Sequence, residues 1–286
     1  MSAGARTPRT PHTAGRSQRT PRAAAALHPA FVLHRYDWSE SSLILDLFTR
    51  EQGRVAVAAK GAKRPYSQWR SVLLPFQRLH VGFGLRRSRA AADGESAEVQ
   101  PLKAAEWAGG GAVLDGAALL RGFYLNELLM KLLARQDPHP ALFDAYAQTL
   151  PALADGCDTR LEAALRAFEL VLLREIGLLP DLRVVTLTQQ PAAPGVLHAL
   201  RPETGLVPTS RGEAGLSPAH WAALQSALDE RDLAALQRAS LPVLAELKGL
   251  LRNLLHYHLP TSGLRTRQLM LELQNLSTRF PSPALP

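Results

Sequence analysis

The sequence predicts an α+β multidomain protein in which a small β-barrel precedes a helical domain that carries an irregular insert. Short β-prone runs separated by turn residues fill residues 29–107. Helical periodicity dominates residues 108–180 and 216–286, whereas residues 181–215 lose it and resemble short strands and turns. A chain of 286 residues with 46% apolar side chains is long enough to form such cores.

Five strands are expected in residues 29–107. Residues 31–36, 43–49 and 54–59 are three β-prone runs, and Gly53 in "REQGR" predicts a hairpin between the second and the third. The runs "VLLPFQRLHVGFG" and "AEVQPLKAAEW" supply two more. Five short strands in about 80 residues fit a barrel of the OB type, and a small sandwich fits them almost as well.

After a flexible joint at "AGGGAV" (108–113), the pattern becomes helical. Residues 115–135 are apolar nearly all round, which predicts a buried central helix. Further helices are expected within 138–156 and 159–179, and residues 241–259 and 266–276 continue the helical pattern after the insert. Ser217 followed by Pro218 is typical of a helix start, as N-cap and first helical residue.

Positive charge is concentrated at the front of the chain, which has a net charge of +8. Residues 1–28 carry five arginines and no acid and are expected to be a disordered tail. Residues 108–180, in contrast, carry six cations and nine anions. A basic front half indicates a polyanionic partner, with nucleic acid favoured over an anionic membrane surface.

The single cysteine, Cys157, excludes an internal disulfide and a multi-cysteine metal site, and it fits a reducing cytoplasm. Catalytic motifs are not recognisable: "AAKGAKRP" lacks the spacing of a phosphate-binding loop, and His256 and His258 point to different sides of a helix. We therefore expect a binding protein without cofactors rather than an enzyme. A metal-dependent nuclease is the enzymatic alternative.

The most informative stretch is residues 54–89, since no acid lies between Glu51 and Asp93. Proteins that bind single-stranded nucleic acid combine cations for phosphates with aromatic rings for bases. The alternative is an ordinary solvated face with Trp69 packed in the core. The predicted nucleic-acid-binding residues are Arg54, Lys60, Lys63, Arg64, Tyr66, Trp69, Arg70, Arg78, Arg86 and Arg87.

Several motifs together resemble the RecO family of bacterial recombination mediators. "AFVLHRYDWSESSLILDLFTREQGRVAVAAKGAKRP" and "LLPFQRL" are similar to the family's amino-terminal domain. The resemblance continues in "GFYLNELLMKLL", "ALRAFELVLLREIG" and "GLRTRQLMLEL", so it covers roughly residues 29–275. It places Lys60 and Gly61 of "AKGA" in the family's characteristic loop, with Lys63 and Arg64 beside them.

The resemblance implies an OB-fold domain followed by a helical domain, in a bacterial cytoplasmic protein associated with the nucleoid. It implies binding of single- and double-stranded DNA, strand annealing, and loading of RecA onto gaps coated with single-stranded DNA-binding protein. The implied partners are RecR and the acidic, apolar carboxyl-terminal tail of single-stranded DNA-binding protein. A general OB-fold binder of single-stranded RNA is the alternative.

The chain departs from the family at one place. Many members carry a four-cysteine zinc ribbon in the insert, but residues 181–215 contain no cysteine, so we expect a metal-free insert.

A receptor for the acidic tail requires a cation beside apolar side chains. Arg166, next to Leu165 and Phe168, is the first candidate, with Arg121 and Arg174 behind it. The alternative is that Arg166 only pairs with Glu162 or Glu169 on its own helix.

Overall fold

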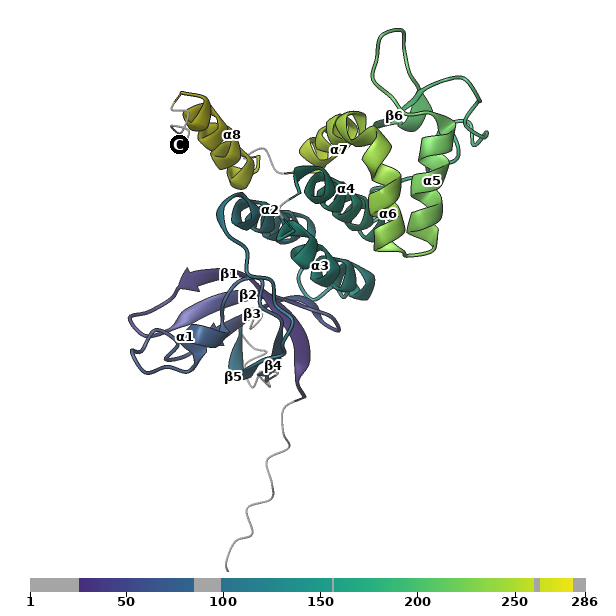
Figure 1. Cartoon of the computed structure of the whole chain (residues 1–286). Coiled ribbons are helices and arrows are strands. Elements are labelled where there is room, and N and C mark those ends of the chain that lie inside the picture. Colours follow the sequence, from purple (N-terminus) through teal and green to yellow (C-terminus); the bar gives the residue numbers. More distant parts are fainter. Residues whose placement is uncertain (1–25, 85–98, 156, 260–262, 280–286) are drawn as a thin grey trace, which may run out of the picture.

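The computed structural model describes residues 26–84, 99–155, 157–259 and 263–279. Figure 1 shows a barrel with a group of helices packed on one side of it. The predicted tail up to residue 25 and the predicted site residues Arg86 and Arg87 lie outside the described residues.

The barrel is closed and has five strands in the order β1-β2-β3-β5-β4, with β4 pairing back to β1. All pairings are antiparallel except that of β3 with β5, where Ala56 is opposite Val99. This is the OB arrangement, so the predicted barrel is confirmed and the sandwich alternative is wrong. The strands are β1 (His28–Asp37), β2 (Leu43–Thr49), β3 (Gly53–Ala59), β4 (Leu79–Phe83) and β5 (Val99–Trp107), with the short helix α1 (Trp69–Val72) before β4.

Alternation along β2 and β3 fills the barrel interior. Leu45, Leu47, Val55 and Val57 are all buried in one cluster and recur at every second position, as a pleated strand requires. Gly53, with φ of 64°, begins β3, and a Cβ there would lie 1.9 Å from the carbonyl oxygen of Asp137. Glycine is therefore required at this position, where the β2–β3 hairpin passes under the helical domain.

The helical domain is built around one buried helix, α4, of which eleven residues are buried. Ser217 caps α5 as expected, because its hydroxyl oxygen accepts from the backbone N–H of His220 at 3.3 Å. None of the described helices combines the length and the apolar character needed to cross a membrane. The elements are α2 (Gly116–Leu132), α3 (Pro140–Leu153), α4 (Asp158–Glu175), β6 (His198–Arg201), β7 (Gly205–Pro208), α5 (Pro218–Asp229), α6 (Leu233–Ser240), the 3-10 turn η1 (Leu241–Val243), α7 (Leu244–His258) and α8 (Arg265–Arg279).

The barrel and the helices share a core. Phe31 of β1 and Phe48 of β2 face outward, and both rings pack against Phe143 of α3 at centroid distances of 5.2 and 5.4 Å. Tyr146 packs on the same two rings, and its hydroxyl donates to Asn126 Oδ1 at 2.5 Å. Asn126 Nδ2 in turn donates to the carbonyl of Leu33 at 2.9 Å. The two units are therefore joined by interior packing rather than by a solvated contact.

A buried carboxylate lies at the edge of this interface. Asp46 is fully buried, with Arg54 Nε at 3.4 Å, Arg135 Nη2 at 3.7 Å and the Tyr36 hydroxyl at 3.2 Å. Arg54 also donates to the backbone carbonyls of Met130 and Leu133 at the end of α2. Arg54 thus connects a barrel carboxylate with the end of a helix.

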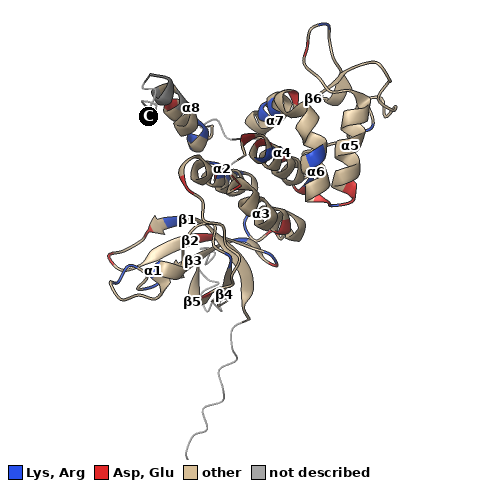
Figure 2. Cartoon of the chain, viewed as in Figure 1, with Lys and Arg blue, Asp and Glu red and all other residues tan. Residues whose placement is uncertain are grey.

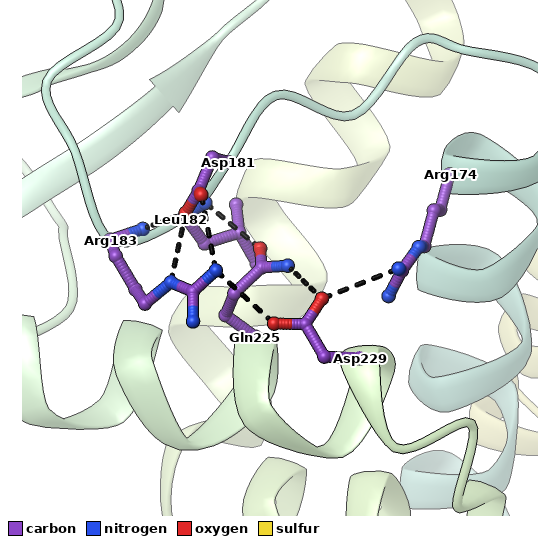
Figure 3. Close-up of polar contacts among 6 residues, drawn as sticks. All are labelled: Arg174, Asp181, Leu182, Arg183, Gln225 and Asp229. Carbon is purple, nitrogen blue, oxygen red and sulfur yellow. Dashed lines mark hydrogen bonds and ion pairs between the residues drawn. The ribbon is translucent and has the colours of Figure 1, made fainter. Parts of the chain in front are cut away.

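The insert contains a two-stranded sheet of β6 and β7 and is anchored to α4 and α5 (Figure 3). Leu182 N donates to Gln225 Oε1 at 3.0 Å, while Asp229 pairs with Arg183 at 3.2 Å and with Arg174 at 3.3 Å. Within the described ranges, no group of three or more His, Cys, Asp or Glu side chains is placed to hold a metal ion. The metal-free insert remains a prediction.

Removing the Asp46 carboxylate should destabilise the whole protein. Asp46→Ala leaves Arg54, whose side chain is 13% exposed, without its charge partner, and such a loss costs about 3 kcal/mol. The matched control is Asp144→Ala, which breaks the solvent-exposed pair with Arg50 across the same interface and should cost much less. Urea unfolding of both variants measures the difference. Equal losses would contradict a special role for the buried pair.

Candidate nucleic-acid interface and basic pocket

Residues 60–70, the loop after β3 and the first two residues of α1, are called here the basic segment. It folds as successive turns: Arg64 N donates to Gly61 O at 3.2 Å, Ser67 N to Arg64 O at 3.0 Å, and Arg70 N to Ser67 O at 3.2 Å. Gly61 has φ of 74°, a conformation that favours glycine. These bonds give the segment a defined shape, so its side chains are presented on an ordered loop.

The cations of the basic segment are largely unneutralised. Lys60, Arg64 and Arg70 are exposed, and no carboxylate of the described residues lies within 4.0 Å of them. Lys63 pairs with Asp37 at 3.1 Å, and such an exposed pair is weak enough for a phosphate to compete. Figure 2 shows these cations in blue on the loop that leads to α1. The result is an uncompensated positive surface at one end of the barrel.

Aromatic side chains line an open cavity of about 560 Å³ in the same segment. Tyr66 is 99% exposed and is free to stack on a base, and Lys60 and Arg64 lie beside it in the cavity wall. Trp69 is partly buried against the barrel core and also lines the cavity. The packing of Trp69 on the core agrees with the alternative interpretation, and its part in nucleic-acid binding stays a prediction.

The remaining predicted binding residues of the barrel are not part of this cluster. Arg54 lies under the helical domain with a side chain that is only 13% exposed, so we leave it out of the candidate interface. Arg78 is exposed just before β4, and its carbonyl accepts from Ala108 N at 2.9 Å. The described contacts do not connect Arg78 with the basic segment.

A second feature, called here the basic pocket, is a cavity of about 210 Å³ between α2, α4, α7 and α8. Its apolar wall includes Leu165, Leu255 and Leu271. Figure 2 shows Lys and Arg positions on α4, α7 and α8 where these helices converge. The cations that line the pocket are Arg121, Arg166, Lys248, Arg252 and Arg267.

Arg166 lies in the wall of the basic pocket with a side chain that is 8% exposed. Its Nη2 is 2.9 Å from Glu169 Oε1, so the expected pair within the helix is present, while Glu162 pairs with Lys248 instead. Arg166 Nε is buried and has no hydrogen-bond acceptor among the described residues.

Glu169 lies behind Arg166 and is fully buried. Tyr124 Oη donates to Glu169 Oε1 at 2.6 Å, but Oε2 has no partner among the described residues. Burial raises the pKa of the Glu169 carboxyl, and the Arg166 charge and the Tyr124 hydrogen bond only partly oppose this effect. Glu169 therefore holds Arg166 in place through Oε1, while its own Oε2 receives no hydrogen bond from the described residues.

Arg252 of α7 and Arg267 of α8 were not singled out by the sequence analysis. They lie on two different helices that meet only in the tertiary structure. No spacing in the sequence therefore indicates that the two arginines are neighbours. Burial lowers the pKa of Arg267, and the neighbouring Arg252 charge lowers it further. Since no ion pair to Arg252 or Arg267 occurs in the described structure, the pocket has an unbalanced positive potential.

The other two predicted partner residues have different positions. Arg121 lines the basic pocket and pairs at 3.2 Å with Asp158, an exposed acid at the start of α4. Arg174 borders a separate cavity and belongs to the Asp229 network shown in Figure 3. Arg121 and Arg166 thus share one pocket, and Arg174 does not belong to it.

The α8 wall of the basic pocket is held by Glu127 of α2. The carboxylate accepts from Arg265 N at 2.9 Å, from Thr266 N at 3.0 Å and from the Thr266 hydroxyl at 2.6 Å. Lys131 Nζ donates to the Gly263 carbonyl beside it. A carboxylate at a helix N-terminus satisfies free N–H groups and is favoured by the helix dipole. Glu127 therefore fixes the helix that supplies Arg267 and Leu271.

The structure joins an OB-type barrel, which carries an unneutralised cationic loop, to a helical domain with a basic pocket. These two features define a class of multidomain binding proteins. Comparison of the sequence with known families places the chain within this class. The family described as "Recombination protein O N terminal" matches residues 26–98, and "Recombination protein O C terminal" matches residues 113–268. The chain belongs to the RecO family.

Similar proteins confirm this assignment over most of the chain. A protein named DNA repair protein RecO from Verminephrobacter eiseniae is 54% identical over 250 residues, which cover 87% of this chain and 96% of that protein. A protein of the same name from Albidiferax ferrireducens is 52% identical over 251 residues, with the same coverage of both chains.

Protonation of Glu127 should release α8. Burial alone would raise the pKa of this carboxyl, but the hydrogen bonds from Thr266 and Arg265 hold it below the ordinary value of 4.5. The pKa of Glu127 is lower in the folded state than in the unfolded state. Its contribution to the stability is therefore fully present above pH 4.5, and it is lost as the pH falls through the pKa of the folded state. The protection factors of α8 amides, which are exchange rates corrected for the intrinsic effect of pH, should therefore fall on acidification below the ordinary value.

Glu127→Gln separates this effect from general acid unfolding. The variant should show fast α8 exchange already at neutral pH while α4 remains protected, because the amide loses the charge and one of its acceptor oxygens becomes a donor. Slow α8 exchange in Glu127→Gln would show that another contact holds the helix.

Proposed function

We propose that the protein is a non-enzymatic DNA repair protein that binds DNA, anneals complementary single strands, and helps to load RecA onto gaps coated with single-stranded DNA-binding protein. The observation that carries this proposal is the unneutralised basic segment beside the fully exposed ring of Tyr66. Membership of the RecO family supports it, since the similar proteins are named DNA repair protein RecO. The proposed setting is the bacterial cytoplasm, at the nucleoid.

Binding through this surface would be largely independent of base sequence. Lys and Arg side chains that contact phosphates release condensed counterions, which supplies affinity for any strand. An exposed tyrosine adds stacking on an unpaired base, because every base has a π face. A protein that holds a strand by its backbone leaves the pairing edges of the bases free, and annealing requires this.

The alternative function is that of a general binder of single-stranded RNA. The same cations and rings would serve it, because phosphates and base faces are common to both nucleic acids. Strand annealing on templates coated with single-stranded DNA-binding protein separates the two functions. Only the proposed mediator should accelerate annealing of coated complementary strands.

The basic pocket is the proposed site for the carboxyl-terminal tail of single-stranded DNA-binding protein. That tail is acidic and ends in an apolar residue with a free carboxylate. The pocket offers unneutralised Arg252 and Arg267, with apolar side chains around them. Charge-assisted hydrogen bonds and burial of the terminal side chain would act together. RecR is a second proposed partner.

Replacing Lys60, Lys63, Arg64 and Arg70 together with Ala should weaken DNA binding more than tenfold at low salt, because phosphate contacts are lost. Each lost contact should reduce the slope of log affinity against log salt by about 0.7 for a single strand. Fluorescence anisotropy over a salt series measures both quantities.

The matched control removes four exposed arginines of the helical domain: Arg160, Arg211, Arg231 and Arg238. The net charge changes equally, so a general charge effect would appear in both variants. If the barrel variant binds like the wild type, the basic segment is not the DNA site.

The peptide site is tested with a synthetic acidic tail peptide. Arg252→Glu should weaken its binding at least tenfold, since a repulsive charge replaces an attractive one in the pocket. Arg252 is exposed, so the fold should be unaffected, whereas Arg166→Glu would bring a second carboxylate against buried Glu169. Arg231→Glu is the control outside the pocket, because Arg231 is exposed and borders the other cavity. Calorimetry of peptide binding, with DNA affinity measured in parallel, decides the case. A peptide that binds Arg252→Glu normally but fails to bind Arg231→Glu would move the site to the other cavity.

A further inference from the structure

Helix α8 supplies one wall of the basic pocket. Arg267, Met270 and Leu271 of α8 line the cavity, and Leu264 lines it just before the helix begins. The other walls come from α2, α4 and α7. Figure 1 shows α8 beside α2 and apart from α5 and α6. If α8 moved away from α2, the cavity would become an open surface and would lose the charge of Arg267.

Hydrogen bonds to α2 hold the first turn of α8, but the rest of the helix buries little apolar surface. Glu127 accepts from the backbone N–H groups of Arg265 and Thr266 and from the Thr266 hydroxyl. Farther along the helix, the side chains of Leu269 and Leu273 are 48% and 49% exposed. An element with few buried apolar contacts opens locally at a low free energy. The docking of α8 on α2 therefore depends strongly on the Glu127 carboxylate.

Like charges within the basic pocket oppose this docking. Arg252 of α7 and Arg267 of α8 both line the cavity, and neither forms an ion pair within the described structure. Burial, followed by the Arg252 charge, lowers the pKa of Arg267, so the two guanidinium groups lie close enough to repel each other. Glu169 has the smallest influence on Arg267 and does not cancel this repulsion. An acidic ligand between the two arginines would replace repulsion with attraction on both sides.

We propose that Glu127 is the positioning residue that docks α8, and that docking of α8 and binding of an acidic peptide in the basic pocket stabilise each other. This proposal rests on the proposed peptide site and adds a coupling between that site and one helix. The peptide binds the docked form better, because only that form presents Arg267 together with Arg252, so it shifts α8 toward the docked form. The coupling is reciprocal, since the factor by which docking raises peptide affinity is also the factor by which the peptide favours docking.

Glu127→Gln tests the positioning role by calorimetry with the acidic tail peptide. Peptide affinity should fall about tenfold, within the range of roughly 5- to 150-fold that is typical of coupled sites, while DNA affinity stays unchanged. Thr266→Val removes the hydroxyl that donates to the same carboxylate, at a position that does not line the pocket, so it should act in the same direction by a smaller factor. The matched control is Glu246→Gln, the same change at an exposed position of α7 outside the pocket, which should be neutral.

A double-mutant cycle separates positioning from a general loss of structure. Arg267→Ala should weaken peptide binding in the wild type but should have much less effect in Glu127→Gln, because α8 no longer holds Arg267 at the pocket. Arg252→Ala should weaken binding by the same factor in both backgrounds, since α7 carries Arg252. A general loss of structure would reduce both arginine effects alike.

Hydrogen exchange measures the coupling from the other direction. A saturating concentration of the acidic peptide should raise the protection factors of α8 amides in the wild type about tenfold. A matched peptide with asparagine in place of each aspartate should leave them unchanged. Equal protection by both peptides, unaltered α8 protection with the acidic peptide, or an Arg267→Ala effect of equal size in both backgrounds would each overturn the coupling.

Failure of the proposed peptide site gives a different result. In that case the wild type does not bind the acidic peptide, or Arg252→Glu binds it as the wild type does, and the coupling is overturned together with the site. If only the coupling is wrong, Arg252→Glu loses the peptide while Glu127→Gln keeps it.

Discussion

The packing of Phe31 and Phe48 against Phe143 and Tyr146 is the contact on which the other features depend. Strands β1 and β2 place alternate side chains in the barrel and on the helices, so one pair of strands serves two cores. The barrel and the helical domain are thereby held in one arrangement. The candidate DNA surface and the basic pocket consequently have a fixed spatial relation, although different segments of the chain form them.

Cations in this protein fall into two physical groups. Arg54 pairs with a buried carboxylate, because a charge removed from water requires a counter-charge or hydrogen-bond acceptors. Arg174 pairs with Asp229 at the half-exposed contact between α4 and α5. Lys60, Arg64 and Arg252 stay at the surface without a carboxylate partner among the described residues, and water solvates their charges there. The second group is therefore the one available to polyanionic ligands, and the first maintains the architecture that presents it.

Two carboxyl groups, the partly exposed one of Glu127 and the buried one of Glu169, organise the basic pocket in opposite ways. Glu127 accepts three hydrogen bonds from the start of α8, which stabilise its ionised form. Glu169 receives a hydroxyl and a guanidinium on one oxygen and nothing described on the other, so burial dominates and its pKa rises. One carboxyl thus positions a helix, and the other positions Arg166.

The sequence by itself determined the local features. Alternation over residues 43–49 and helical spacing through residues 159–175 are short-range patterns, and both correspond to the observed elements. The acid-free stretch was equally visible, because charge composition needs no structure. Only the tertiary structure decided how the strands close and which cations remain free. Arg252 meets Arg267, and the turn at Ser41 meets the basic segment, through folding of segments whose spacing carries no periodic signal. Long-range pairing depends on packing between elements, and local periodicity does not encode it.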